Sequence, residues 1–261
     1  MALKFYDLSQ PFYAGVPLWP WPTMVDTVIE RVSFPERDLF PSDPQRGRLN
    51  KMTTVIKTKF HASTHMDAPL HVLEGGLSVD QVPLANCYGE GVIVDMRYLK
   101  KWDVIGRRDL DNAKPQIKKG DFVVINTGWH QYFPKMGYVF FNHFPSFYTE
   151  AGDWFVEHEV KAVAIDGGAN DHPCAHAPLD KYAPWLDREY KAETGRDPAK
   201  EFPIYEPCHL ALAQHGIPGI EIAGGQIDEV TGKRCTLACF PIRYQGGEAS
   251  LVRLVAIVEE K

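Results

Sequence analysis

The stretch from residue 60 to residue 71 reads Phe60-His61-Ala62-Ser63-Thr64-His65-Met66-Asp67-Ala68-Pro69-Leu70-His71. It contains three of the ten histidines of the chain, spaced with one carboxylate as His-x3-His-x-Asp-x3-His. Imidazole and carboxylate groups gathered in so short a stretch are typical of a metal site. The alternative is a cluster of core or surface histidines that binds no metal. The density of ligand groups favours the metal site.

The spacing of these four groups also constrains the local fold. A continuous helix would place the first two histidines on one face and turn the carboxylate and the third histidine away. A straight strand would put all four on one face but would spread them over about 30 Å. Pro69 excludes a helix that continues through this point. The groups therefore converge if the chain folds back in a loop or turn, and the β-branched residues 53–60 predict the strand that leads into it.

The ligand set indicates what the site does. Neutral imidazole and carboxylate bind Zn²⁺, Mn²⁺ or Fe²⁺. Two histidines and one aspartate leave positions open for water and substrate, which distinguishes a catalytic site from a structural one. A bound water then becomes a hydroxide nucleophile near neutral pH. The remaining histidine, His71, is the candidate for proton transfer because an unperturbed imidazole titrates near pH ~6.5.

Composition and charge narrow the class of protein. The chain has 261 residues, 44% of them hydrophobic and 24% charged, which suits one large α/β domain. A net charge of −6 argues against nucleic acid or an anionic membrane as a partner. No apolar stretch approaches the ~18 residues of a membrane span, and the first residues lack the apolar core of a signal peptide. Five cysteines without paired short spacing suit a reducing compartment. The sequence predicts a cytoplasmic protein that acts on a small molecule.

Residues 1–22 are predicted to form an extended N-terminal arm. Prolines at positions 11, 17, 20 and 22 exclude a helix, and large aromatic side chains accompany them. Phe12 and Trp19 are candidates for substrate binding, in this subunit or in a neighbouring one. The alternative is that these aromatic side chains pack against the surface of their own domain.

Three short apolar runs predict buried strands. They cover residues 91–96, 121–130 and 160–168, and a helix with Thr149 as its N-cap is expected between the last two. The alternation of helices and apolar strands indicates a mixed α/β sheet in one domain, since no linker or internal repeat divides residues 1–261. Further strands are expected at residues 24–33, 217–223, 234–241 and 250–258, a loop at 34–50 and a helix at 208–215.

Residues 171–205 interrupt this alternation. They contain five prolines, many charges and few aliphatic side chains, which is typical of an insertion that lies over the surface. The segment opens with Asp171, His172 and His176, which are candidate ligands. A polar loop whose histidines are hydrogen-bonded is the alternative.

The segment from His61 to His71 resembles the His-x-Gly-Thr-His-x-Asp-x-Pro-x-His signature of the Putative cyclase family, which includes bacterial kynurenine formamidase and isatin hydrolase. Ser63 stands where the signature usually has glycine. Supporting similarity extends along most of the chain, to Asp7-Leu8-Ser9 with Pro17, Trp19 and Pro20, to Gly120–Val123 and Thr127–Trp129, to Ala164–Asp166 with Asp171, and to His209 and Glu221.

The resemblance implies a single-domain swivelling β/β/α fold with a mixed central sheet, a homodimer or homotetramer, and a metal-dependent amidohydrolase that acts on carbon–nitrogen bonds other than peptide bonds. It also implies one or two zinc or manganese ions per subunit. Carried over residue by residue, the resemblance makes His71 the general acid/base. The metal ligands that it implies are His61, His65 and Asp67 for the first ion, with Asp67, His209 and Glu221 bridging to a second.

These observations together predict a hydrolase that opens a cyclic amide, imide or lactone, or cleaves an N-acyl or N-formyl amide. Metal-bound hydroxide would attack the carbonyl, the metal would hold the oxyanion, and His71 would protonate the leaving atom. A metal-dependent lyase or cyclase that stabilises an enolate is one alternative, and a non-catalytic metal- or ligand-binding protein is another. The arm aromatics favour a flat substrate. The insertion at 171–205, absent from typical formamidases, is expected to reshape the pocket.

Overall fold

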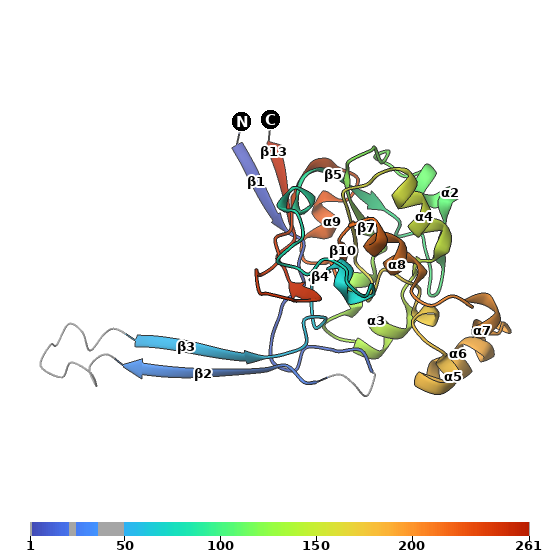
Figure 1. Cartoon of the computed structure of the whole chain (residues 1–261), viewed down its shortest axis with the longest axis horizontal. Coiled ribbons are helices and arrows are strands. Elements are labelled where there is room, and N and C mark those ends of the chain that lie inside the picture. The colour runs from blue at the N-terminus through green and yellow to red at the C-terminus, as the bar shows by residue number, and fades with distance from the viewer. Residues whose placement is uncertain (1, 21–24, 36–49, 261) are drawn as a thin grey trace, which may run out of the picture.

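Most strands of the described residues belong to one mixed sheet (Figure 1). The computed structural model describes residues 2–20, 25–35 and 50–260. Most of the predicted loop at 34–50 lies outside these ranges. The strands of the sheet are β1 (Ala2–Asp7), β4 (His65–Asp67), β5 (Tyr88–Asp95), β7 (Phe122–Asn126), β9 (Ala162–Ile165), β10 (Gly219–Glu221), β11 (Arg234–Ala238), β12 (Ala249–Leu251) and β13 (Val255–Glu260).

The strand order is β1-β13-β11-β5-β7-β9-β10-β4-β12, which confirms the predicted mixed α/β sheet. Strands β5, β7, β9 and β10 are parallel, and the strands on both sides pair antiparallel. The strand expected over 250–258 is instead two strands, with β12 at one end of this order and β13 next to the strand at the other end. Residues 252–254 cross between them because the sheet curls: Val252 N donates to Thr64 O and Leu8 N donates to Leu254 O.

Helices pack against the central strands. Helix α4 begins at Thr149, which is its first helical residue and not the predicted N-cap; Tyr148 precedes it without a side-chain cap. Gly152 lets α8 approach α4 closely, since an added Cβ would come 3.1 Å from the Cα of Cys208. The α helices are α2 (Arg107–Asp111), α3 (Gly137–His143), α4 (Thr149–Glu157), α5 (Leu179–Tyr182), α6 (Pro184–Thr194), α7 (Pro198–Glu201), α8 (Pro207–Gln214) and α9 (Ile227–Val230), and the 3-10 helices are η2 (Pro69–His71), η3 (Leu84–Cys87), η4 (Trp129–Tyr132) and η5 (Pro173–Ala175).

The central strands are buried on both faces, which explains their continuous apolar sequences. In β7, Phe122 and Val124 join a cluster made by the curled sheet itself, together with residues of β1, β11 and β13. Val123 and Ile125 point the other way and join a second cluster with α4 and α8. Burial of α8 in this second cluster fixes the helix that carries His209.

The segment at 171–205, predicted as a surface insertion, contains helices α5, α6 and α7 and a small apolar core of its own. Its opening is not a surface loop, because Asp171 and His172 are fully buried. Both ring nitrogens of His172 are within hydrogen-bond distance of the backbone, of Trp102 O and Cys174 N. The core residues are Trp102, Cys174, Ala175, Leu179, Ala183, Leu186, Tyr190 and Phe202.

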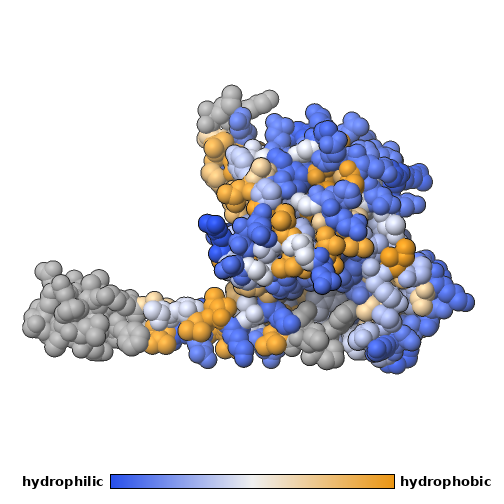
Figure 2. Space-filling model, viewed as in Figure 1, coloured by the Kyte–Doolittle hydropathy of each residue, from blue (hydrophilic) through white to orange (hydrophobic). Residues whose placement is uncertain are grey.

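Strands β2 (Val28–Pro35) and β3 (Asn50–Lys57) form a two-stranded ribbon that projects away from the main sheet (Figure 1). Strand β3 leads into the His61 turn, where the sequence predicts a strand. Side chains alternate between the two faces of a ribbon. Val28, Val32 and Val55 are exposed on one face, and Met52 and Ile56 on the other, as the hydrophobic colouring of the ribbon in Figure 2 reflects.

A short parallel pair, β6 (Val104–Ile105) and β8 (Ser146–Phe147), lies beside the main sheet. Among the residues that the structure describes, no helix is both long enough and apolar enough to cross a membrane.

His130, on η4 just after β7, lies between two carboxylates. Its Nδ1 is 3.0 Å from Asp166, and its Nε2 is 3.4 Å from Asp228. Burial alone would lower the pKa of His130, but these carboxylates raise it above 6.5. The protonated imidazole therefore stabilises the fold fully below pH 6.5, and this contribution is lost as the pH rises through the raised pKa.

We expect the stability of the wild type to fall by about 1–2 kcal/mol more than that of His130→Gln when the pH rises from about 6 to about 9. The physical reason is that glutamine carries no proton to lose. Urea denaturation followed by circular dichroism at both pH values measures the difference. Parallel pH profiles for the two proteins would show that His130 makes no such contribution.

Candidate metal centre

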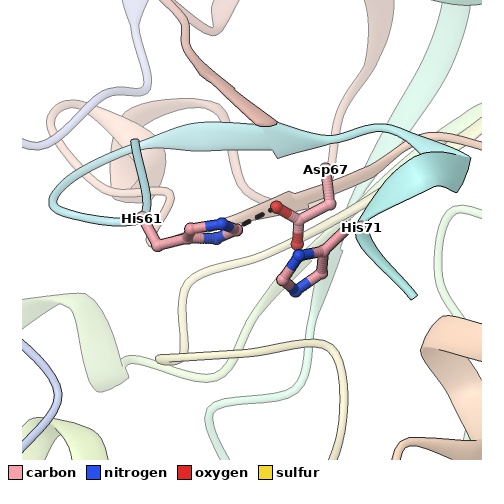
Figure 3. A group of neighbouring side chains, drawn as sticks. All are labelled: His61, Asp67 and His71. Atoms are coloured by element: carbon pink, nitrogen blue, oxygen red, sulfur yellow. Dashed lines mark ion pairs between the residues drawn. The ribbon is translucent and has the colours of Figure 1, made fainter. Parts of the chain in front are cut away.

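Four of the predicted site residues come from one short stretch of chain. Strand β4 places His65 and Asp67 on the same face, because alternate residues of a strand point the same way. The turn before β4 carries His61, and η2 begins at Pro69 and ends at His71. Figure 3 shows the His61 ring pointing at one oxygen of the Asp67 carboxylate and the His71 ring lying next to the carboxylate. The chain thus folds back and brings the groups together, as their spacing predicts.

The distances within this stretch are those of a compact cluster. Nδ1 of His61 lies 3.2 Å from Oδ1 of Asp67 and 3.0 Å from Nε2 of His65. Nε2 of His65 is 3.4 Å from the same carboxylate oxygen. The ring centroids of His61 and His71 are 4.5 Å apart. Imidazole nitrogens therefore surround the carboxylate.

Two distant segments complete the cluster. Strand β10 pairs with β4 so that Glu221 lies opposite His65, and Oε2 of Glu221 is 3.4 Å from Nε2 of His65. Helix α8 brings His209, whose Nε2 is 2.9 Å from Glu221 Oε1 and 3.6 Å from Asp67 Oδ2. Residue spacing alone does not single out His209 or Glu221, and the family resemblance supplied both.

Asp67 lies at the centre of this cluster. The surroundings of its carboxylate show whether the cluster suits a metal ion. The residue is 5% exposed, yet neither carboxylate oxygen accepts a hydrogen bond from the described residues. A buried polar group without a partner costs roughly 1–3 kcal/mol, and more when it is charged. Asp67 belongs to both groups of ligand atoms that lie within 4.8 Å of one another, His61–Asp67–His71 and His65–Asp67–Glu221. These nitrogen and carboxylate donors fit a divalent metal ion, which would satisfy the buried oxygens.

The charges of the cluster also fit a cation. Burial would raise the pKa of Asp67, but the surrounding imidazoles hold it well below its usual range. Burial would lower the pKa of His61, but Asp67 and Glu248 raise it to about 10. For His209, burial is again outweighed by neighbouring carboxylates, and the pKa is raised. Without a metal, protons on these imidazoles balance the buried carboxylates, which is the role that a metal cation would take over.

His71 differs from its neighbours. Burial lowers its pKa below 6.5; Asp67 opposes this shift, and His61 and His209 reinforce it. The imidazole of His71 is therefore neutral at neutral pH and can accept a proton or a metal ion. The geometry groups His71 with His61 and Asp67, and the predicted ligand His65 lies equally close to both, with its Nε2 3.0 Å from Nδ1 of His61 and 3.4 Å from Oδ1 of Asp67.

Asp171 positions His209 and has no signal in the sequence for this role. Its Oδ2 lies 2.6 Å from Nδ1 of His209, and its two oxygens accept the backbone N–H groups of Cys208 and His209. A carboxylate on one ring nitrogen orients the other nitrogen toward a metal and raises its basicity. Asp171 therefore holds Nε2 of His209 toward Glu221 and Asp67.

Replacing Asp171 with asparagine is expected to weaken metal binding about 10- to 100-fold, because the amide cannot stabilise the ring orientation as a carboxylate does. Competition titration against a metal-sensitive dye measures the affinity. Asp180→Asn, an exposed carboxylate in the same segment, is the matched control. Equal affinities for wild type and Asp171→Asn would rule out this positioning role.

The cluster opens into a cavity of about 300 Å³. Trp19 of the N-terminal arm forms part of its wall, where the sequence predicts a substrate contact. The ring of Trp19 packs 5.1 Å from Phe141 and 4.9 Å from His176. The residues lining the cavity are Trp19, Lys59, His61, His71, Ala169, His176, Glu206, His209, Glu221 and Glu248.

The structure does not bring Phe12 to this cavity. Phe12 lines a separate hollow of about 330 Å³, beside Ser63, Thr64 and Phe240. It also packs against the aromatic cluster around Phe141. Its predicted contact with substrate stays a prediction without support from this geometry.

Residues 6–172 match the family described as Putative cyclase. A kynurenine formamidase of Erythrobacter litoralis is 26% identical over 252 residues, covering 97% of this chain and 93% of the relative. A kynurenine formamidase of Bacillus cereus is 23% identical over 257 residues, covering 97% and 96%. The solved structure of isatin hydrolase A from Ralstonia solanacearum superposes with a TM-score of 0.74 at 20% identity, covering 98% of this chain and 92% of that one.

The match covers more than half of the chain and includes the cluster residues His61, His65, Asp67 and His71. The superposition on isatin hydrolase A extends over 98% of the chain and agrees with the family match. The chain belongs to the Putative cyclase family.

Proposed function

We propose that the protein is a metal-dependent hydrolase that opens a cyclic amide, imide or lactone, or cleaves an N-acyl or N-formyl amide. The observation that carries this proposal is the buried Asp67 carboxylate, which no described residue satisfies although imidazoles and a second carboxylate surround it. The names of the similar proteins, kynurenine formamidase and isatin hydrolase, support a carbon–nitrogen bond of a small molecule as the target.

A bound divalent metal would acidify a water molecule and polarise a carbonyl oxygen. His71 is the proposed general acid/base, because it lines the cavity and its lowered pKa leaves a neutral imidazole. It accepts a proton as the carbonyl is attacked and returns it to the leaving nitrogen or oxygen. The charge of Asp67 beside it stabilises the imidazolium formed in between. The proposed ligands are His61, His65, Asp67, His209 and Glu221.

We further propose a homodimer or homotetramer built on the swivelling β/β/α fold, with one or two zinc or manganese ions per subunit. The β2–β3 ribbon supports association, since it exposes aliphatic side chains on both faces and an isolated two-stranded ribbon is marginally stable in water. The likeness to isatin hydrolase A supports the fold.

Elemental analysis of the purified protein, followed by a panel of formanilides, isatins, lactams and lactones, tests the proposed function. We expect turnover that is lost on chelation, is restored by zinc or manganese, and places ¹⁸O from labelled water in the product. Turnover without ¹⁸O would favour a lyase or cyclase. Stoichiometric metal without turnover of any substrate would favour a binding protein.

A further inference from the structure

Glu206 holds an unusual backbone conformation at the wall of the cavity. It directly precedes α8 and has φ 50° and ψ 42°, a left-handed conformation that costs a residue with a side chain about 1–2 kcal/mol. Its N–H donates to Ala175 O at 2.7 Å, and its carbonyl accepts from Leu210 N at 2.9 Å. These bonds and the following Pro207 fix the backbone. The carboxylate is thereby held at the cavity.

The Glu206 carboxylate has unused capacity to accept hydrogen bonds. Its Oε1 lies 3.4 Å from Nδ1 of His176, a long contact. Within the described residues, the contact of Oε1 with His176 is the one side-chain hydrogen bond of Glu206, and Oε2 takes no part in it. The side chain is 33% exposed, so a molecule in the cavity can reach it. A carboxylate offers about four acceptor sites, and one at most is used here.

The other charged groups of the cavity wall differ from Glu206. Glu248 lies 3.7 Å from Nε2 of His61 and 3.4 Å from the Tyr244 hydroxyl, so it already faces a proposed metal ligand. Lys59 is exposed at the mouth. Beside Glu206, the rings of His176 and Trp19 meet edge to face, with centroids 4.9 Å apart and planes inclined at 68°, and together form an angled aromatic wall. Glu206 is therefore the carboxylate placed next to a surface for an aromatic ring.

We propose that Glu206 is a specificity-determining residue that accepts hydrogen bonds from a cationic or N–H donor group on a flat substrate. This inference rests on the proposed function, because it names the substrate class of the same site. The favoured substrates carry an ammonium, amidinium or amino group at this position. A carboxylate at the same position is disfavoured by repulsion from Glu206.

Three planar probes of equal size isolate this interaction: benzamidinium, benzamide and benzoate. Isothermal titration calorimetry of the metal-loaded full chain gives their Kd values without requiring turnover. We expect Glu206→Gln to weaken benzamidinium about 10- to 100-fold, as for a hydrogen bond to a charged group. Benzamide should change less than about twofold, and benzoate should bind as well or better.

Two further variants separate recognition from a merely structural role. His176→Gln keeps the carboxylate and should keep the preference for benzamidinium. Glu193→Gln removes an exposed carboxylate that does not line the cavity and should behave as wild type. The proposal is overturned if wild type binds benzamidinium no better than benzamide, if Glu206→Gln weakens all probes equally, or if His176→Gln reproduces its effect. Since binding is measured apart from turnover, these outcomes stay distinct from a failure of the proposed hydrolysis.

Discussion

Replacing Asp67 with asparagine is expected to lower kcat/KM by about a thousandfold or more and to remove the bound metal. The side chain keeps its size but loses its charge and half of its acceptor capacity. Asp67 belongs to both ligand groups, so its loss weakens every position at which a metal fits. A larger effect is expected here than for any peripheral carboxylate.

Metal content by elemental analysis and kcat/KM on the best substrate of the panel measure this effect together. Circular dichroism checks that the fold is intact, and Asp153→Asn, an exposed carboxylate on α4, is the matched control. Because the neighbouring imidazoles hold the pKa of the wild-type carboxylate low in the metal-free protein, the metal-free Asp67→Asn protein should unfold more easily than the metal-free wild type. Retention of stoichiometric metal and activity in Asp67→Asn would contradict the proposed centre.

Replacing His71 with glutamine is expected to lower kcat by about 10²- to 10⁴-fold while leaving the metal content unchanged. Glutamine can keep a hydrogen bond but cannot carry a proton between water and the leaving group. KM should change little, because the proton transfer occurs on the way to the transition state. Partial recovery of activity with added imidazole would support proton transfer as the missing step.

The metal content decides between two roles for His71. Its grouping with His61 and Asp67 also suits a ligand, and a ligand variant would lose metal together with activity. If His71→Gln kept both full activity and full metal content, His71 would be neither the general acid/base nor a metal ligand. His215→Gln, at the exposed C-terminal end of α8, is the matched histidine control.

The strands and the local part of the site were predictable because their determinants lie close together in the chain. A central strand that is buried on both faces needs a continuous apolar run, such as residues 121–130. That run can be recognised in the sequence itself. Four site residues fall within eleven positions, and Pro69 forces the turn that gathers them. Spacing and residue type were therefore sufficient to predict that these side chains gather into a cluster that could hold a metal, and the proton-transfer role of His71 stays a prediction.

Other features depend on packing between distant segments. The crossing of residues 252–254 from the edge strand β12 to β13, which lies near the other edge, follows from the curl of the sheet. Hydrogen bonds, and not residue patterns, reveal this crossing. The core of the 171–205 segment uses Trp102, which precedes it by many residues. Composition suggested a surface insertion, because the segment as a whole contains five prolines, many charges and few aliphatic residues.

The sequence by itself determined the α/β class, the His61–His71 cluster and, through family resemblance, the further candidate ligands His209 and Glu221. Tertiary structure decided how these ligands meet, since β10 pairs with β4 and sets Glu221 opposite His65. The tertiary structure also brings Asp171 to His209, 38 positions away in the chain, and Glu206 to His176, 30 positions away. The physical reason is that a turn is governed by neighbouring residues, whereas contacts between separate elements exist only after the sheet and α8 have packed.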